Sequence, residues 1–598
     1  MDSQNLGELL AGDRIQSSPY KLLMKQDMYC EQVCITNLGR SEQHGVKLNK
    51  VVKAIRDGYH HNWIVDNLNA AYKWEDDRRI VVKYIDGFPV GLVAPDGMAY
   101  IHNHVNIEVM IHPLYSWDKE DYRIVRFTVE PFSIGHQFDF FSTEEVADSV
   151  HALPAIANIT NPIDSCRSGA QKHTSFDMVK THIPQLASGK VLFTYDVIWI
   201  VNPDLEWSNR WDVYLTMDYL VPAKVHWYSI FNTFTAILLL GAVAALMVGR
   251  LLSDALSDVE STTEQDPGAT EKSQEAAGHM IHTDVFRPPS HPLRFSVCCG
   301  TGAQILCTAI LIINMSSLGF LNPARRGFLL LGLITVFCVS GFLGGYVAGR
   351  LHKSFGEDQW RPCATYTAVC FPGLVACVFC LVNILASVSG STYAAPFGVW
   401  LFLAILWLGM LTPLVFAGTY FGFRREKTST GDDSVPGPTT SEPRPIPVQP
   451  WYRNRVLTTL GFGIIPFSAC YVEFFFIMAS LWQGQCYYVF GFLFLVLLAT
   501  MVLISELSMM GACVQYRNGD HQWWWRSWTN GGSMAIYMAL YAMLFYPLMG
   551  IEWSQATSVL YFGYMTAICV GVFLMMGFVG VASSLWFYKK LFATIKVH

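Results

Sequence analysis

The sequence predicts an integral membrane α-helical bundle of nine transmembrane helices, preceded by an N-terminal β-rich domain on the lumenal side. Three observations support this prediction. The 598 residues are 52% hydrophobic and only 15% charged, which is too apolar for a soluble protein of this length. Residues 1–224 contain short runs of β-branched and aromatic residues. Residues 225–598 instead contain apolar runs of roughly 20 residues, the length that crosses a bilayer.

The lumenal domain, residues 1–224, is predicted from runs that end in turn signals such as Asp86-Gly87 and Pro95-Asp96-Gly97. Strands punctuated in this way indicate an antiparallel fold, and no helical periodicity is expected in this part of the chain. The predicted strands are at residues 80–85, 90–93, 122–129 and 191–200.

Three of the 15 cysteines precede the first long apolar run: Cys30, Cys34 and Cys166. A Cys30–Cys34 disulfide is one interpretation for an oxidising compartment, and a larger loop closed by Cys166 with either of them is another. Reduced and buried thiols are the third. Asn158-Ile159-Thr160 is the one clear N-glycosylation sequon of this domain, so Asn158 is the predicted acceptor.

The transmembrane domain, residues 225–598, is predicted to cross the bilayer nine times, because only helices satisfy their own backbone at that depth. Two polar connections, at residues 251–294 and 424–456, are predicted to be cytosolic linkers, since they are rich in Ser, Thr and Pro and lack apolar periodicity. The predicted spans are 227–248, 295–318, 327–348, 364–386, 397–421, 457–481, 487–510, 531–549 and 559–587.

The basic residues predict the orientation. They concentrate on alternate connections and on the tail, whereas the short loops between them carry only Arg325 and Arg326. The positive-inside rule then places the N-terminal domain in the lumen and the C-terminus in the cytosol. The basic residues on the cytosolic side are Arg250, Lys272, Arg287, Arg294, Arg350, Lys353, Arg361, Arg424, Arg425, Lys427, Arg444, Arg453, Arg455, Arg517, Arg526, Lys589, Lys590 and Lys596.

Two carboxylates lie within neighbouring predicted spans: Glu473 in the sixth and Glu506 in the seventh. A carboxylate in hydrocarbon costs several kcal/mol unless it is paired or protonated. One interpretation is a proton- or ion-linked site, or a contact for polar groups of a client helix. The other is a protonated carboxyl group that is hydrogen-bonded to a neighbouring helix.

Gly341, Gly345 and Gly349 recur at four-residue spacing in the third span, with Gly344 beside them. Such a face lets another backbone approach closely, either a helix of the same bundle or a helix of a client protein. Trp523-Trp524-Trp525-Arg526, at the start of the eighth span, is interpreted as an interfacial aromatic anchor.

Several motifs resemble the nonaspanins, the transmembrane-nine superfamily of the endomembrane protein 70 type. The resemblance covers nearly the whole chain, and it implies residence in Golgi and endosomal membranes and a role in sorting other membrane proteins. The motifs are Asn62-Trp63-Ile64-Val65-Asp66-Asn67-Leu68, Trp207-Ser208-Asn209-Arg210-Trp211-Asp212, Asp284-Val285-Phe286-Arg287-Pro288-Pro289, Tyr471-Val472-Glu473-Phe474-Phe475-Phe476-Ile477, Tyr488-Val489-Phe490-Gly491-Phe492 and Trp523-Trp524-Trp525-Arg526-Ser527.

The chain departs from the family's pattern at both ends. Members usually begin with a signal peptide and a longer lumenal segment, so the β-rich domain is expected to be N-terminally incomplete. The family often ends in Lys-X-Asp or Lys-X-Glu, which resembles a coat-protein retrieval signal. Here the tail reads Lys596-Val597-His598, with the lysine but without the terminal acidic residue.

Together these features predict a sorting or escort factor for membrane-protein cargo in the Golgi and endosomal system. The expected partners are membrane lipids, client transmembrane proteins and, through Lys596, vesicle coat proteins. The alternative is an ion- or proton-coupled transporter or channel that uses Glu473 and Glu506. Neither an enzyme nor a cofactor is expected, because the histidines at 60, 61, 102 and 104 have no helical metal-ligand spacing and no phosphate loop is present. The net charge of −6 argues against nucleic acid as a partner.

Overall fold

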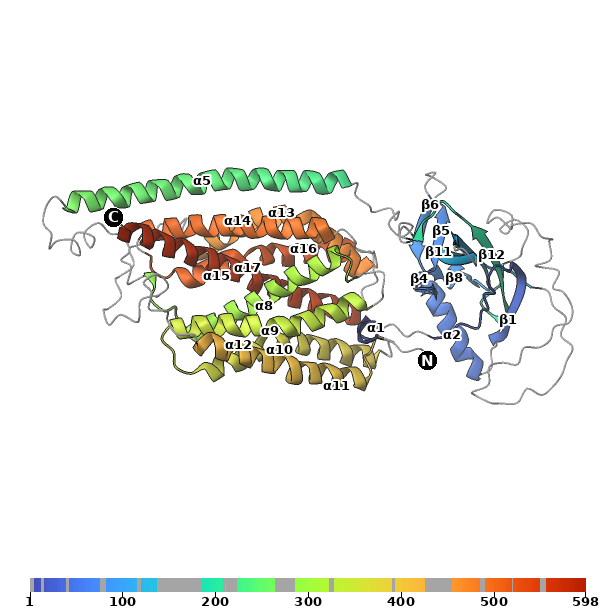
Figure 1. Ribbon diagram of the computed structural model, residues 1–598. Helices are drawn as coiled ribbons and strands as arrows, with labels where there is room; N and C mark the ends of the chain where they lie inside the picture. The colour runs from blue at the N-terminus through green and yellow to red at the C-terminus, as the bar shows by residue number, and fades with distance from the viewer. Residues whose placement is uncertain are drawn as a thin grey trace. The chain divides into compact units, whose positions relative to one another are not determined.

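The computed structural model divides into two compact units (Figure 1). One comprises residues 1–2 and 15–220, and the other comprises residues 3–14 and 221–598. The described residues are 5–11, 16–38, 42–75, 82–115, 120–136, 184–207, 210, 223–263, 285–321, 327–389, 393–424, 454–483, 490–518, 520–548 and 555–597.

The first unit is built on a β-sheet, as predicted. Among its described residues the largest sheet has six strands in the order β1-β12-β10-β11-β5-β6. Apolar residues alternate along β10 and β11 and form the core, where Ile107, Val109 and Val129 are almost fully buried. The strands are β1 (Met28–Leu38), β2 (His60–His61), β3 (Ile64–Val65), β4 (Leu68–Asn69), β5 (Ala71–Glu75), β6 (Val82–Asp86), β7 (Phe88–Pro89), β8 (Gly91–Val93), β9 (Ala99–Ile101), β10 (His104–Tyr115), β11 (Glu120–Phe132) and β12 (Gly189–Val201).

Two details of this unit differ from the sequence prediction. The sheet is mixed, because β10 pairs with β12 and β11 pairs with β5 in the parallel sense. A helix, α2 (Glu42–Arg56), is also present. Leu48, Val51, Val52 and Ile55 have the i, i+3, i+4, i+7 spacing of an amphipathic helix, and they pack against a small apolar cluster beside β1, β8 and β9. The expectation that this part lacks helical periodicity was therefore wrong.

The second unit is a helix bundle. Among the described residues, nine segments are long and apolar enough to cross a membrane, which confirms the predicted number of spans. These segments are Trp227–Ser253, Pro292–Ser317, Phe328–Ser354, Trp360–Val388, Phe397–Arg424, Arg455–Trp482, Phe490–Arg517, Trp523–Leu548 and Gln555–Ala593.

The bundle has an interior and an edge. Figure 1 shows α5 along the edge of the bundle beside α14, whereas α8 and α17 run through its interior. The most apolar window of α5 has only 11% of its residues buried, against 56% for α8 and for α17. The helices are α5 (Ala223–Thr263), α8 (Pro292–Ser317), α9 (Phe328–Ser354), α10 (Trp360–Val388), α11 (Phe397–Leu406), α12 (Thr412–Arg424), α13 (Arg455–Gln483), α14 (Phe490–Arg517), α15 (Trp523–Gly532), α16 (Met534–Leu548) and α17 (Gln555–Val597).

Some spans are interrupted. A π-helical turn, η3 (Trp407–Leu411), separates α11 from α12 directly before Pro413, and Thr412 Oγ1 donates to the Trp407 carbonyl at 2.9 Å. Pro372 lies inside α10 and Pro466 inside α13. The eighth span is divided at Ser533 into α15 and α16.

The N-terminal helix α1 (Leu6–Ala11) belongs to this second unit, where it contacts α9 and α11. Asn5 and Glu8 form a capping box: each side chain accepts the other residue's backbone N–H at 2.9 Å. Gly7 lies directly against Gly327, where a Cβ at either position would meet the other's backbone.

Candidate functional site

The two intramembrane glutamates occupy different surroundings. Glu473, on α13, is only 2% exposed and lies next to Phe474 of the bundle core. Glu506, on α14, is half-buried, and its Oε1 faces α5, where a Cβ at Gly241 would lie 3.0 Å away. Its Oε2 is buried and has no hydrogen-bond partner within the described part of the chain. Glu506 is therefore placed at the contact between α5 and α14, and Glu473 in the interior.

The glycine face of α9 packs against α12 of the same bundle. A Cβ at Gly341 would lie 2.6 Å from Leu411 Cδ1, and one at Gly345 would lie 2.9 Å from Thr419 Oγ1 and closer still to the Val415 carbonyl. A Cβ at Gly349 would meet the Thr419 carbonyl oxygen at 2.5 Å. Gly345 and Gly349 therefore admit no side chain unless the helices separate, whereas at Gly341 the Leu411 side chain would have to move.

The opposite helix has the same feature. Gly418 and Gly422 of α12, also four residues apart, lie against the backbone of Phe342 and Tyr346 on α9. Small residues on both helices thus allow mutual close approach. Of the two interpretations of Gly341, Gly345 and Gly349, the structure shows packing within the same bundle and not a client-docking face, because α12 covers that face.

The three consecutive tryptophans bind a segment of the chain that is distant in sequence. Trp523 Nε1 donates to the Val285 carbonyl at 2.7 Å, Trp524 Nε1 to the Arg287 carbonyl at 2.9 Å, and Trp525 Nε1 to the Ser290 carbonyl at 2.7 Å. Trp523 and Trp524 are stacked, with 4.0 Å between ring centroids, and are almost fully buried. The interpretation as an interfacial anchor was wrong for Trp523 and Trp524, because buried indoles that bond to backbone carbonyls do not contact the lipid interface. Trp525 is only half-buried, and its hydrogen bond is exposed.

The predicted linker at residues 251–294 is therefore partly structured. Its first part continues α5 to Thr263. Residues 285–290 pack against the three tryptophans, and Val285 is fully buried. Residues 264–284 lie outside the described part of the chain.

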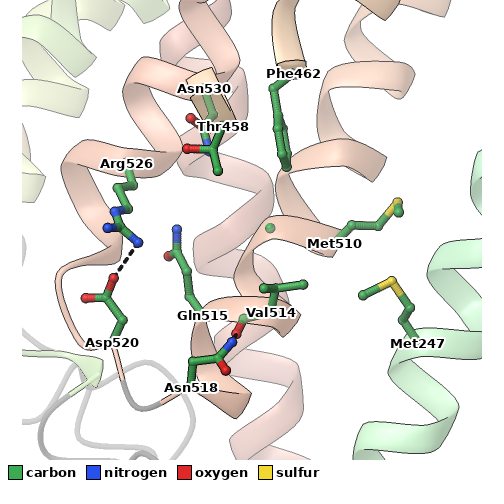
Figure 2. Close-up of a pocket in the computed structure, with 11 residues that line it drawn as sticks. Met247, Thr458, Phe462, Met510, Val514, Gln515, Asn518, Asp520, Arg526 and Asn530 are labelled. Carbon is green, nitrogen blue, oxygen red and sulfur yellow. Dashed lines mark hydrogen bonds and ion pairs between the residues drawn. The ribbon is translucent and has the colours of Figure 1, made fainter. Parts of the chain in front are cut away.

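A cavity of about 250 Å³ lies at the end of the bundle that contains the turn between α14 and α15 (Figure 2). Its polar side chains include Gln515 of α14, Asp520 of the turn, and Arg526 and Asn530 of α15. Its apolar side is formed by Met247 of α5, Phe462 of α13, and Met510 and Val514 of α14. Three consecutive helices, α13, α14 and α15, therefore meet the sequence-distant α5 around one cavity.

An ion pair defines the polar side of this cavity. Arg526 Nη1 lies 2.5 Å from Asp520 Oδ2, and the two side chains are 22% and 4% exposed. Asp520 Oδ1 also accepts the backbone N–H of Gln522 at 3.1 Å. Asn530 Oδ1 accepts a hydrogen bond from Thr459 Oγ1 at 3.1 Å. Gln515 is 8% exposed, and its Oε1 has no hydrogen-bond partner.

Sequence reasoning missed this cavity. From the sequence, Arg526 is interpreted only as a cytosolic basic residue and as part of the tryptophan motif, and no role is assigned to Gln515, Asp520 or Asn530. The pattern that predicts such a site is a set of polar residues within one turn of several helix ends. That pattern is common at membrane interfaces, so it points to a binding site only once the helices are placed side by side.

Histidines of the first unit lie within hydrogen-bond distance of other groups in the same unit. His102 Nδ1 lies 2.9 Å from the Pro89 carbonyl, and burial lowers the pKa of His102 while that carbonyl opposes the shift. His104 is 1% exposed, and its Nδ1 lies 2.8 Å from Thr194 Oγ1, which lies 3.0 Å from His136 Nε2. No group of three or more potential metal ligands occurs among the described residues.

The cysteine pairing is partly resolved. Cys30 is disulfide-bonded, whereas Cys34 has a free thiol whose pKa is raised by burial. The predicted Cys30–Cys34 disulfide was therefore wrong. Cys166, the alternative partner, lies outside the described residues, as does the predicted glycosylation site Asn158. Lys596 lies in the last turn of α17, and His598 is not among the described residues.

Comparison with known proteins agrees with the architecture. Residues 1–555 match the family described as Endomembrane protein 70. The chain is 34% identical to Transmembrane 9 superfamily member 10 of Arabidopsis thaliana, over all of this chain and 88% of that protein. It is 31% identical to Transmembrane 9 superfamily member 4 of Homo sapiens, over all of this chain and 89% of that protein. No solved structure matches the chain.

Proposed function

The chain belongs to the endomembrane protein 70 family of transmembrane 9 proteins, and on that premise we propose that it sorts or escorts membrane-protein cargo in Golgi and endosomal membranes. The family's description as an endomembrane protein agrees with that location. The proposal needs a surface within the bilayer on which a client helix is recognised. The contact between α5 and α14 supplies one.

Glu506 is the observation that carries the proposal. A polar atom in hydrocarbon without a hydrogen bond costs several kcal/mol, so it is expected to have a partner when the protein functions. Glu506 Oε2 has none among the residues that the structure describes. Gly241 is the α5 residue that faces this carboxyl group. Because it is a glycine, it has no side chain that covers the group. A polar side chain or a small-residue backbone of a client helix would complete the hydrogen bond.

The packing of α5 makes this contact reachable from the lipid. Phe231, Phe234, Leu238 and Leu239 on α5 are all more than half exposed, although each is large and apolar. In a bundle within the bilayer this exposed surface faces acyl chains. A client helix that diffuses in the membrane can therefore reach the α5–α14 contact without first entering an aqueous space.

The alternative function, an ion- or proton-coupled transporter, uses the same carboxylates in another way. Its specific support is that Glu473 and Glu506 lie on two helices in contact, α13 and α14. Transport requires each carboxyl group to exchange a proton or hold a cation. Recognition of a client requires only a hydrogen bond at Glu506.

Two substitutions at Glu506 separate the functions. Glu506→Gln keeps a hydrogen-bonding side chain but cannot titrate, whereas Glu506→Leu removes both properties. If the protein is an escort, surface delivery of its clients should be near normal with Gln and reduced with Leu. Surface biotinylation with quantitative mass spectrometry, in cells that express only the variant, measures this delivery.

Proton and cation flux into vesicles that contain the purified protein provides the second measurement. The transport proposal predicts flux with the wild type that Glu506→Gln or Glu473→Gln abolishes. If this is observed, and Glu506→Leu delivers clients normally, the protein is a transporter and not an escort.

The tail is a second, separable part of the proposal. We propose that Lys596 contributes to binding of vesicle coat proteins and that His598, in place of an acidic residue, keeps this binding weak. A tail peptide with His598→Asp should therefore retain more coat protein than the native tail in a pulldown, and a Lys596→Ala peptide should retain less than either. Equal retention by all three peptides would remove the tail from the proposal.

A further inference from the structure

The cavity between α5, α13, α14 and α15 has the chemistry of an amphiphile site. Gln515 and Arg526 lie within about one helical turn of the ends of α14 and α15. Phe462 and Met510 lie roughly 10 Å from the nearest ends of α13 and α14, at a rise of 1.5 Å per residue. The cavity thus extends from the depth of lipid headgroups toward the depth of acyl chains.

The charges on the cavity wall select the class of headgroup. Arg526 and Asp520 are the charged residues among the described residues that line the cavity, and they pair with each other at 2.5 Å. The wall is therefore neutral, with one positive and one negative group side by side. A ligand that carries a negative and a positive group matches such a wall better than an anion or a cation alone.

An unpartnered acceptor narrows the choice of headgroup further. Gln515 is 8% exposed, and its Oε1 has no hydrogen-bond partner among the described residues. A buried carbonyl oxygen without a donor is unfavourable, so the occupant is expected to donate a hydrogen bond there. A primary ammonium group has three N–H donors, whereas the quaternary ammonium of choline has none.

We propose that this cavity binds the headgroup of a phosphatidylethanolamine-type lipid. The phosphate lies against Arg526, the ammonium group donates to Gln515 Oε1 and faces Asp520, and the acyl chains pass Met247 and Phe462. A volume of about 250 Å³ fits the headgroup and not a complete lipid, which places the chains outside the cavity. This inference does not rest on the escort function, because lipid binding is measured without any client.

Native mass spectrometry of the purified full-length protein, with defined lipids added, tests the inference. Phosphatidylethanolamine should bind at one high-affinity site and should raise the melting temperature. Phosphatidylcholine should bind about tenfold more weakly, the effect of losing one hydrogen bond from a charged donor. Equal binding of the two lipids, or tighter binding of anionic phosphatidylserine or phosphatidylinositol, would overturn the proposal. So would equal binding of free phosphoethanolamine, since the acyl chains would then contribute nothing.

Variants locate the site. Gln515→Leu should abolish the preference for phosphatidylethanolamine over phosphatidylcholine. Gln304→Leu is the matched control: Gln304 is also a buried glutamine, but on α8, where its Nε2 donates to the Phe337 carbonyl at 3.0 Å, so the preference should persist. A preference that survives Gln515→Leu would contradict the assignment. If Gln515→Leu does not fold, Val514→Phe decides, because it fills the cavity from α14: loss of the bound lipid supports the site, and retention overturns it.

Discussion

At Gly345 the absence of a side chain determines how two helices pack. The backbone of α12 lies where a Cβ would be, and Gly418 and Gly422 give α9 the same access to α12. Dispersion contacts between closely packed backbones provide much of the attraction between helices in a bilayer, where no hydrophobic effect separates protein from lipid. Single hydrogen atoms at Gly345, Gly349, Gly418 and Gly422 therefore set the distance between α9 and α12.

Gly345→Ala should destabilise the protein by about 1–3 kcal/mol, because the added methyl group forces the helices apart. Gly461→Ala is the matched control, since a Cβ at Gly461 on α13 would meet no atom within 4 Å. The control should be neutral or more stable by about 0.5–1 kcal/mol, the helix-propensity difference. Thermal melting of the purified full-length protein in detergent measures both. Equal melting temperatures for the two variants would contradict the packing described.

His102 makes the stability of the first unit depend on pH. Burial lowers its pKa in the folded state below the unfolded value of about 6.5. Between the two values the unfolded chain binds more protons, so stability rises with pH in that range. The contribution of His102 is complete above pH about 6.5 and is lost as the pH falls toward the folded-state pKa. The domain should therefore lose protection in acid.

His102→Gln should reduce this dependence, because Gln can donate to the Pro89 carbonyl but does not titrate. Hydrogen exchange of residues 82–115 in the full-length protein, at pH 7.5 and 5.5 with correction for the intrinsic rates, measures it. The comparison with the wild type is needed because His104 and His136 are buried nearby. If the variant and the wild type lose protection equally, His102 has no part in the effect.

At the scale of elements, α15 combines two roles. Its tryptophans hold residues 285–290 by three indole hydrogen bonds, and on the same helix Arg526 and Asn530 line the cavity. A shift of α15 would therefore change both the contact with the segment before α8 and the polar wall of the cavity. The break at Ser533 separates α15 from α16.

Trp523→Phe should destabilise the contact with residues 285–290 by about 1–3 kcal/mol, because it leaves the buried Val285 carbonyl without a donor. Trp525→Phe is the comparison, since its bond to Ser290 is exposed and water can replace the indole. Hydrogen exchange of residues 285–290 should accelerate strongly in the first variant and slightly in the second. The reverse order would show that burial does not control the strength of these bonds.

At the scale of the whole molecule, the nine membrane-length helices among the described residues are an odd number, from which we expect the two ends of the chain on opposite sides of the membrane. The concentration of basic residues on alternate connections then predicts that Asn158 is lumenal and His598 cytosolic. In sealed microsomes, protease should remove a tag placed after His598, and Asn158, if it is glycosylated, should carry a glycan that endoglycosidase releases only after detergent is added. Protection of the C-terminal tag from protease would contradict a cytosolic C-terminus.

The sequence alone determined the elements whose cause is local. The nine spans among the described residues follow from apolar runs that must satisfy their own backbone in lipid. The predicted strands at residues 80–85, 90–93, 122–129 and 191–200 follow from side-chain alternation between turns, and they overlap β6, β8, β11 and β12. Helix α2 was equally readable, since Leu48, Val51, Val52 and Ile55 have helical spacing. It was missed among the surrounding strand signals.

Only the tertiary structure decided which surfaces meet. The sequence shows that α9 has a glycine face but not that α12 covers it, and it shows three tryptophans but not that carbonyls more than 200 residues away accept their hydrogen bonds. The cavity draws on four helices, and the unpartnered oxygens of Glu506 and Gln515 exist only after every other donor has been placed. Pairings of this kind depend on packing between distant segments, and no local pattern of residues specifies them.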